Sequence, residues 1–230
     1  MNPDSRIMSF LAKLGDMFIL NVLYLVCCIP VMTIGAATTA LYYNTLKMAE
    51  NSESYVWREF LRTFKENFKQ ATIIWMIILV IGAVLVGDFL VMGGIGSQAL
   101  ASVTAIVVIV VGVFLILTAV YVFPVLARFD NSVLNIMKYA LLMAIRHLPS
   151  TVVILAIHSV PLLLAFASLE AFIRGLLPVL LFTVSILAYF ESKLFSRIFS
   201  NYYPKTEDYD FAHYNKKNRG GFLTWQNRQK

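Results

Sequence analysis

Long apolar stretches separated by short polar segments dominate the chain. These stretches are residues 17–46, 71–92, 100–126, 151–169 and 175–190. A helix of about 20 apolar residues crosses the hydrocarbon core of a bilayer, and it satisfies its own backbone hydrogen bonds there. The pattern therefore predicts an all-α fold, a polytopic membrane helix bundle with five or six transmembrane helices.

The first stretch, residues 17–46, is too long for one ordinary crossing. It contains Pro30 and Gly35, which interrupt a regular helix. One long kinked helix and a short hairpin of two helices both fit this pattern. The kinked helix gives five transmembrane helices in total, and the hairpin gives six.

Two segments between the apolar stretches are amphipathic. In residues 55–70, apolar and aromatic side chains recur at helical spacing, while Lys, Arg and Glu occupy the other positions. This pattern is typical of a helix that lies in the membrane interface, with aromatic side chains toward lipid. Residues 133–148 are more apolar, and a helix there would start after residues 130–132. We expect both helices on the cytoplasmic side.

The character of the chain changes after residue 200. Residues 201–230 are polar and carry six basic and three acidic residues among several aromatic ones. We therefore divide the chain into an integral membrane helical domain, residues 1–200, and a cytoplasmic basic and aromatic tail, residues 201–230. A solvated tail is the commoner explanation, and docking on anionic lipid or a partner is the alternative.

Composition and charge agree with a membrane protein. Of the 230 residues, 59% are hydrophobic and 14% are charged, against about 45–50% and about 25% in soluble domains. This composition excludes a disordered chain, a fibrous repeat, a disulfide scaffold and most cytosolic enzymes. The net charge of +6 would suit nucleic acid, but Lys and Arg follow the predicted membrane topology, so we expect no nucleic-acid partner.

The distribution of Lys and Arg also bears on orientation. With a hairpin, 18 of the 19 Lys and Arg residues lie on one side of the membrane and Arg174 alone lies on the other. With a single first crossing the division is 16 to 3. The positive-inside rule favours the hairpin modestly. It predicts a cytoplasmic C-terminus in both cases, and a cytoplasmic N-terminus with the hairpin.

Few residues suggest chemistry. The three histidines lack the spacing of metal ligands, and no nucleophile or cofactor motif is present, so we expect no enzyme, no cofactor and no metal. His158 is the ionisable residue near the middle of a predicted span, where a structural hydrogen bond is the commoner role and a proton relay the alternative. We expect Glu191 to reach water from the cytoplasmic end of the last span.

Small and hydroxyl residues at positions 35–40 favour close helix packing, and lining a transport cavity is the alternative. The predicted interfacial segment adds aromatic candidates. The candidate functional or packing residues are Asn21, Pro30, Gly35, Thr38, Thr39, Asn44, Trp57, Phe60, Phe64, Asn67, Phe68 and His158.

Residues 30–43 (PVMTIGAATTALYY) and the FKENFKQ run in residues 64–70 resemble the YesL family of bacterial membrane proteins of unknown function. The resemblance covers most of residues 5–200 and carries no catalytic residues. It implies a Gram-positive-type plasma-membrane protein whose genes often lie near carbohydrate ABC importers and polysaccharide-degrading enzymes. This is an association, which suggests an accessory role in sugar uptake.

We therefore expect a non-enzymatic accessory of a carbohydrate ABC-type uptake system in the bacterial plasma membrane. Its expected partners are the lipid bilayer and importer subunits. The alternative hypothesis is a permease or transporter subunit for a small solute such as a sugar, which the break at Pro30 and Gly35 would suit. Against this alternative, the predicted spans contain few polar residues.

Overall fold

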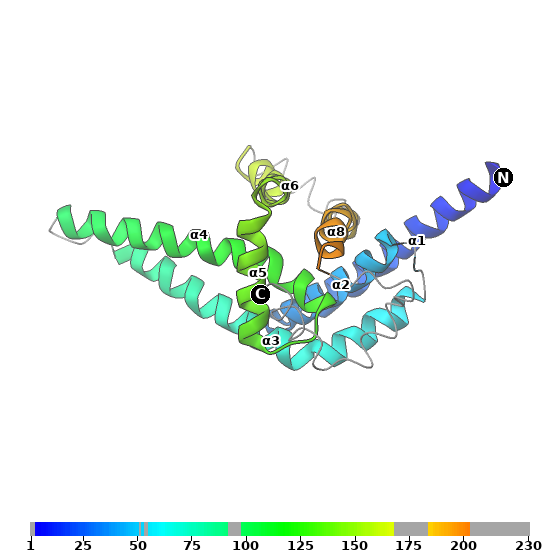
Figure 1. The fold of residues 1–230 in the computed structure, drawn as a ribbon, viewed down its shortest axis with the longest axis horizontal. Coiled ribbons are helices and arrows are strands. Elements are labelled where there is room, and N and C mark those ends of the chain that lie inside the picture. The colour runs from blue at the N-terminus through cyan, green and yellow to red at the C-terminus, as the bar shows by residue number, and fades with distance from the viewer. Residues whose placement is uncertain (1–2, 51, 53–54, 92–97, 168–183, 203–230) are drawn as a thin grey trace.

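The computed structural model describes residues 3–50, 52, 55–91, 98–167 and 184–202 (Figure 1). Its elements are α1 (Pro3–Cys28), the 3-10 turn η1 (Val31–Thr33), α2 (Ile34–Ala49), α3 (Val56–Val91), α4 (Gln98–Arg128), α5 (Val133–Arg146), α6 (Leu148–Ala167) and α8 (Val184–Ser200). These residues contain no strand, so the all-α prediction is confirmed for this part of the chain.

The first apolar stretch folds as two helices that pack against each other. The chain leaves α1 at Pro30, whose backbone is extended (φ −77°, ψ 120°). The Thr33 hydroxyl bonds the carbonyl oxygens of Cys27 at 2.5 Å and Pro30 at 2.7 Å, which satisfies acceptors left open where α1 ends. The interruption expected at Pro30 is therefore present, whereas the one expected at Gly35 is wrong, because Gly35 lies inside α2.

α2 is the central helix of the bundle and contacts α1, α3, α4 and α8 (Figure 1). Twelve of its 16 residues are buried. Ala36, Ala37 and Ala40 are completely inaccessible, because small side chains let neighbouring helices approach on several sides at once. α2 is thus enclosed by protein on most sides.

α3 joins two elements that the sequence analysis separated. The amphipathic segment 55–70 and the apolar stretch 71–92 form one helix, Val56–Val91. No Pro or Gly stands near the junction at residues 70–72 to interrupt the backbone hydrogen bonds. The buried residues of this helix are spaced three, four or eight positions apart and are Val56, Phe60, Thr63, Ala71, Ile74 and Ile78. One stripe therefore packs into the bundle along most of the helix.

α5 begins at Val133, where the sequence predicted a helix after residues 130–132. It ends at Arg146, and α6 starts at Leu148 with a bend of 100° between the two axes. In Figure 1, α5 stands across α3 and α4, while α6 and α8 are seen almost end-on. α6 and α8 thus run across the direction of α3 and α4.

Three of the described helices contain segments that are long and apolar enough to cross a membrane: residues 11–28, 56–91 and 101–128. The bent pair of α5 and α6 adds a fourth if the two count as one span. Lengths and composition of this kind support a multi-pass membrane protein. Most of the predicted span 175–190, and the tail beyond residue 202, lie outside the described residues.

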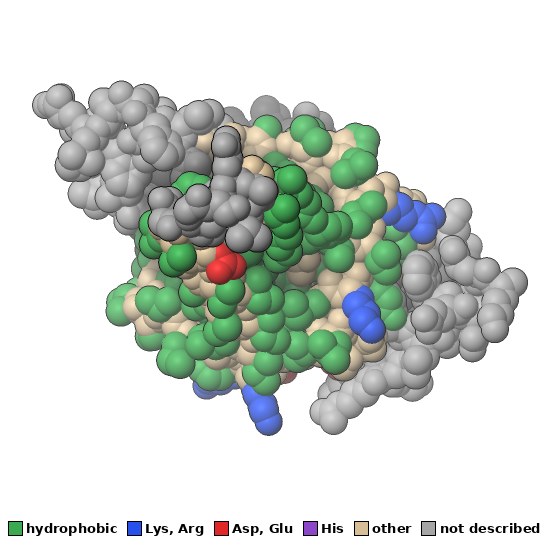
Figure 2. Space-filling view, turned by 90° about the vertical axis from the view of Figure 1, so that its left-hand side faces the viewer, with side chains coloured by type: hydrophobic (Ala, Val, Ile, Leu, Met, Phe, Trp, Pro, Cys, Tyr) green, Lys and Arg blue, Asp and Glu red, His purple; other side chains and the backbone are tan. Residues whose placement is uncertain are grey.

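The side on which α3 and α4 form a long hairpin is covered mostly by hydrophobic side chains, with Lys and Arg near its margins (Figure 2). On α4, Val103, Ile106 and Ile109 are each at least 60% exposed. Exposed apolar surface that continues along two helices is typical of contact with lipid. This surface supports the assignment to a membrane.

Candidate functional site

Polar side chains gather inside the apolar bundle where α1, α2, α6 and α8 approach one another. On α8, Ser185, Glu191 and Ser192 are at most 1% exposed. We call the group the polar cluster, and its members are Asn21, Tyr42, Thr45, His158, Ser185, Glu191 and Ser192. Polar and ionisable groups inside a membrane bundle are expensive and for that reason mark functional sites.

Glu191 is the charged centre of the polar cluster. Its Oε2 accepts a hydrogen bond of 2.5 Å from the Tyr42 hydroxyl, and its Oε1 lies 3.2 Å from Nδ1 of His158. The prediction that Glu191 reaches water at the end of a span is wrong, because this face of α8 turns into the bundle. Lys193 and Arg197 on the same helix are exposed instead. The Tyr42 hydroxyl compensates in part for removing the carboxylate from water, while Oε1 has no hydrogen-bond partner among the described residues.

His158 connects α6 to the polar cluster. Its Nδ1 lies 3.0 Å from the carbonyl oxygen of Ile154, one turn earlier on the helix. About half of the side chain (51%) is exposed, whereas only 2% of the Glu191 side chain is. His158 is therefore the accessible member of the pair.

Two hydroxyl and amide contacts complete the polar cluster. Asn21 Oδ1 accepts hydrogen bonds of 3.2 Å from both the backbone N–H and the hydroxyl of Ser185. The hydroxyls of Thr45 and Ser192 lie 2.7 Å apart. These contacts attach α8 to α1 and α2, since the partners come from distant parts of the chain.

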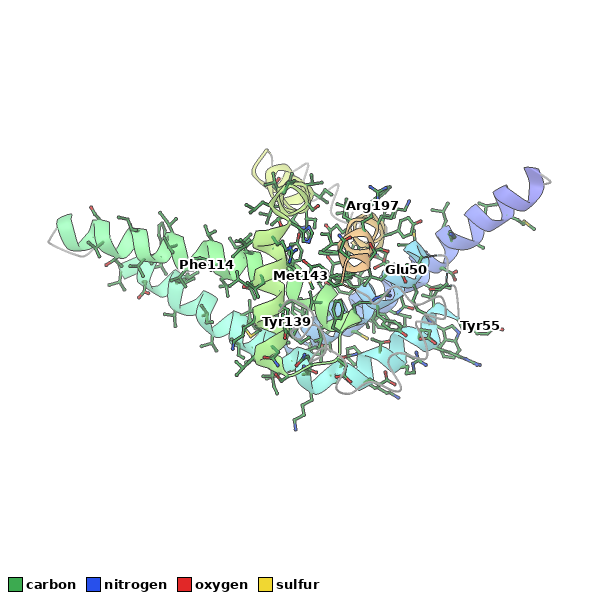
Figure 3. The ribbon with its side chains drawn as sticks, in the orientation of Figure 1. Glu50, Tyr55, Phe114, Tyr139, Met143 and Arg197 are labelled. Carbon is green, nitrogen blue, oxygen red and sulfur yellow. The ribbon has the colours of Figure 1, made fainter. Side chains whose placement is uncertain are left out.

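A buried ion pair lies at the end of α2. Arg128, which is 5% exposed, closes α4 and contacts both carboxylate oxygens of Glu50 at 2.9 and 3.0 Å. The Ser196 hydroxyl on α8 donates to Glu50 Oε1 at 3.1 Å. Figure 3 shows Glu50 beside α8, while Arg197 points away from the bundle. The sequence analysis missed this pair, because two charges 78 positions apart give no signal that they meet.

The candidates on α2 use their polar atoms within the helix. The hydroxyls of Thr38 and Thr39 donate to the carbonyl oxygens of residues 34 and 35, at 2.7 and 2.9 Å. The amide of Asn44 donates to the carbonyl oxygen of residue 40 at 2.8 Å. Bonds to the preceding turn satisfy polar groups inside an apolar bundle without a partner helix.

Gly35 marks the closest approach of two helices. A Cβ at this position would lie 2.6 Å from the carbonyl oxygen of Ala71, 2.8 Å from Cβ of Trp75 and 3.1 Å from the Phe123 ring. The Trp75 indole also donates to the Val31 carbonyl oxygen at 2.8 Å. The backbone of α2 thus rests directly on α3, and Pro30 directs the chain into this contact.

The aromatic candidates on α3 divide between core and surface. Phe60 is fully buried, whereas Trp57 and Phe68 are 47% and 40% exposed. Phe64 lies between the rings of Phe60 and Phe68, with centroid distances of 6.3 and 5.5 Å. Phe60 therefore belongs to the packing of the bundle rather than to a lipid-facing stripe.

The polar neighbours of these rings have roles within α3 as well. The Asn67 amide donates to the Thr63 carbonyl oxygen at 3.1 Å. Arg58 lies 5.1 Å from the Trp57 ring and 5.4 Å from the Tyr55 ring. Figure 3 shows Tyr55 projecting outward at the start of the helix. The N-terminal end of α3 thus presents aromatic rings together with positive charge, a combination suited to the membrane interface.

Metal-ligating residues do not gather in the part of the chain that the structure describes: no group of three or more His, Cys, Asp or Glu could hold a metal ion there.

A family model matches the N-terminal part of the chain. The model of the family described as "Protein of unknown function, DUF624" matches residues 17–89. No curated protein and no solved structure matches the chain. The match contains residues 17–28 of α1, all of α2 and most of α3, and thus Asn21, Gly35, Tyr42 and Glu50. It confirms the resemblance predicted from the sequence: over residues 17–89 the chain is similar to DUF624, the family of YesL-like membrane proteins of unknown function.

Proposed function

We propose that the protein is a non-enzymatic accessory of a carbohydrate ABC-type uptake system in a bacterial plasma membrane. The observation that carries the proposal is the internal bonding of the polar residues on α2. Thr38, Thr39 and Asn44 each donate to the preceding turn of their own helix. The link to sugar uptake comes from the family resemblance.

Sugar transport requires several donors and acceptors that face one polyhydroxylated solute and replace its water. Asn21 accepts two hydrogen bonds from Ser185, and the hydroxyls of Thr38 and Thr39 bond within α2. These side chains act between packed helices. The arrangement supports a scaffold more than a solute path.

The membrane arrangement forms a second part of the proposal. The protein crosses the membrane five or six times, with the C-terminus, the N-terminus and the N-terminal end of α3 on the cytoplasmic side. The support is the distribution of Lys and Arg. On α3, Arg58, Lys65 and Lys69 are exposed in the half that precedes the apolar half, as expected where a helix leaves the membrane on the cytoplasmic side.

Cysteine labelling in intact cells tests this topology. In a variant with Cys27 and Cys28 replaced by alanine, we expect a single cysteine introduced at position 2 or in the tail to resist a membrane-impermeant thiol reagent. Both should react after the membrane is permeabilised. Reaction at position 2 in intact cells would show a single first crossing with an outer N-terminus. Reaction in the tail would contradict the whole topology.

One observation favours the alternative, a permease or transporter subunit for a small solute. Glu191, Tyr42 and His158 place an ionisable pair within the bundle, and such groups often belong to substrate or ion pathways. A solute path through this protein would run past these three residues rather than along Thr38 and Thr39.

Reconstitution separates the two functions. We expect the purified protein alone in liposomes to move no sugar and hydrolyse none, and we expect the tagged protein to co-purify with importer subunits from its native membrane. Saturable sugar flux that is abolished by Asn21→Leu or Thr38→Val would overturn the accessory role. Thr118→Val is the matched control, because this hydroxyl on α4 also bonds its own preceding turn, at 2.8 Å.

A further inference from the structure

We propose that the exposed basic face of α3 binds the headgroups of anionic phospholipids where this helix enters the membrane. Three exposed residues form this face, which we call the basic stripe: Arg58, Lys65 and Lys69. Its ligand is a membrane lipid whose headgroup carries a net negative charge. The inference is independent of the accessory role, because it rests on α3 and its neighbours alone.

Helical geometry puts the basic stripe on the side of α3 that faces away from the bundle. Its members are seven and four positions apart, so they share one face of the helix. Val56, Phe60 and Thr63 on the same half of α3 are buried. At about 100° per residue, their face lies nearly opposite the basic stripe. The stripe therefore points away from the protein.

The acidic residues of this half of α3 already have basic partners. Residues 56–70 contain four basic and two acidic side chains. Arg62 lies 2.5 Å from Glu59 and 4.0 Å from Glu66, and Lys47 on α2 lies 3.7 Å from Glu59. Among the described residues, no ion pair includes a member of the basic stripe. Its charges are therefore available to an external anion.

The apolar half of α3 places the basic stripe at the edge of the hydrocarbon core. From Ala71 to Val91 the helix contains one charged residue, Asp88, near its far end. At about 1.5 Å per residue this half is about 31 Å long, which matches the roughly 30 Å core of a bilayer. Lys69 then lies about 3 Å and Lys65 about 9 Å beyond Ala71 along the axis. The headgroup region, about 5–8 Å thick, covers this level.

The bend of α3 keeps its basic half near the membrane surface. Figure 1 shows α3 changing direction near its middle. With the apolar half across the bilayer, the basic half therefore leaves at an angle and stays closer to the surface than a straight helix would. Trp57 and Phe68, which are 47% and 40% exposed, lie on one flank of the basic stripe. Exposed aromatic rings beside Lys and Arg are typical of headgroup contact.

One acidic residue lies near the membrane end of the basic stripe. Asp130 is exposed and precedes Asn131, whose carbonyl oxygen accepts a hydrogen bond from the Gln70 side chain. One negative charge does not cancel the three positive charges of the stripe. This region of the surface therefore keeps a net positive charge.

A lipid fits the basic stripe better than a free anion does. The members of the stripe are exposed, and a contact between one exposed charge and one free anion in water is weak. An anionic membrane instead presents many negative charges held at the level of the stripe, and each Lys or Arg near such a surface adds to the attraction. The charges thus act together on a lipid surface.

Native mass spectrometry of the full-length protein tests the proposal. The protein in detergent receives phosphatidylglycerol, which is anionic, or phosphatidylcholine with the same acyl chains, which has no net charge. We expect wild type to bind phosphatidylglycerol more tightly. Lys65→Gln and Lys69→Gln should each weaken the binding of the first phosphatidylglycerol about fivefold. Lys65→Arg combined with Lys69→Arg should retain the wild-type affinity, because the charge is kept.

Glu66→Gln is the matched control of opposite sign. It removes a negative charge next to Lys65, and the Glu66 side chain is 63% exposed. Phosphatidylglycerol should therefore bind this variant more tightly than wild type. Both lysines are exposed as well, so without added lipid all these variants should melt close to wild type. Weaker binding by Glu66→Gln, as in the lysine variants, would assign the effect to structure and overturn the proposal.

Two further outcomes would also contradict a lipid site. The first is equal affinity of wild type for phosphatidylglycerol and phosphatidylcholine, or a preference that survives in the double variant of Lys65→Gln and Lys69→Gln. The basic stripe would then be left to another partner, such as a protein. The second is displacement of phosphatidylglycerol by an equal concentration of inorganic phosphate, which would identify a site for the free anion. We expect inorganic phosphate to leave the bound lipid in place.

Discussion

Gly35→Ala is expected to lower the melting temperature of the purified protein, because the new methyl group meets atoms that cannot move aside. Its Cβ would lie 2.6 Å from a backbone oxygen of Ala71 and 2.8 Å from Cβ of Trp75. Overpacking of this kind costs about 1–3 kcal/mol, and the better helix propensity of alanine returns at most about 1 kcal/mol. Thermal unfolding in one detergent measures the difference.

Gly87→Ala is the matched control, since it makes the same change in a helix of the same bundle. Nothing lies within 4 Å of a Cβ at Gly87. Only the better helix propensity of alanine acts at this position, so this variant should be as stable as wild type or slightly more stable. Equal melting temperatures for the two variants would show that α2 and α3 do not meet at Gly35.

Arg128→Met is expected to destabilise the protein by about 3 kcal/mol, the lower end of the range for breaking a buried ion pair. The substitution keeps an unbranched apolar side chain but leaves the Glu50 carboxylate between α2 and α8 without its positive partner. The lower end applies because 25% of the Glu50 side chain is exposed. Chemical or thermal unfolding of the purified protein measures the loss.

Two further variants identify the cause of that loss. Glu50→Gln combined with Arg128→Met removes both charges and should recover part of the stability, because no uncompensated charge remains. Arg62→Met breaks ion pairs with Glu59 and Glu66, and the Arg62 side chain is 52% exposed, so it should change stability by less than about 1 kcal/mol. A double variant as unstable as Arg128→Met would assign the loss to packing instead.

The helical periodicity of the sequence predicted much of the local structure. The apolar stretch 100–126 lies within α4, residues 130–132 precede α5, and the first stretch is interrupted at Pro30. These features depend on neighbours along the chain, such as the loss of a backbone donor at proline. The prediction of two separate elements in residues 55–70 and 71–92 was wrong, because a change from amphipathic to apolar sequence does not end a helix that has no breaking residue.

The candidate site was harder to predict. His158 was singled out from its place in an apolar stretch. Glu191, in contrast, was predicted to reach water, because a carboxylate near the end of a span usually does so. The contact that buries Glu191 comes from Tyr42, 149 positions earlier. Periodicity shows that Ser192 and Phe195 share a face of α8, but it does not say which helix covers that face.

By itself, then, the sequence determined that this chain is helical, apolar enough for a membrane and interrupted at Pro30, because these properties follow from composition and local backbone geometry. Only the tertiary structure decided that α2 lies at the centre, that Gly35 touches the backbone of α3, that Glu191 is buried beside His158, and that Glu50 pairs with the buried Arg128. Ion pairs and close contacts depend on the distance between atoms remote in the sequence, and packing alone sets that distance.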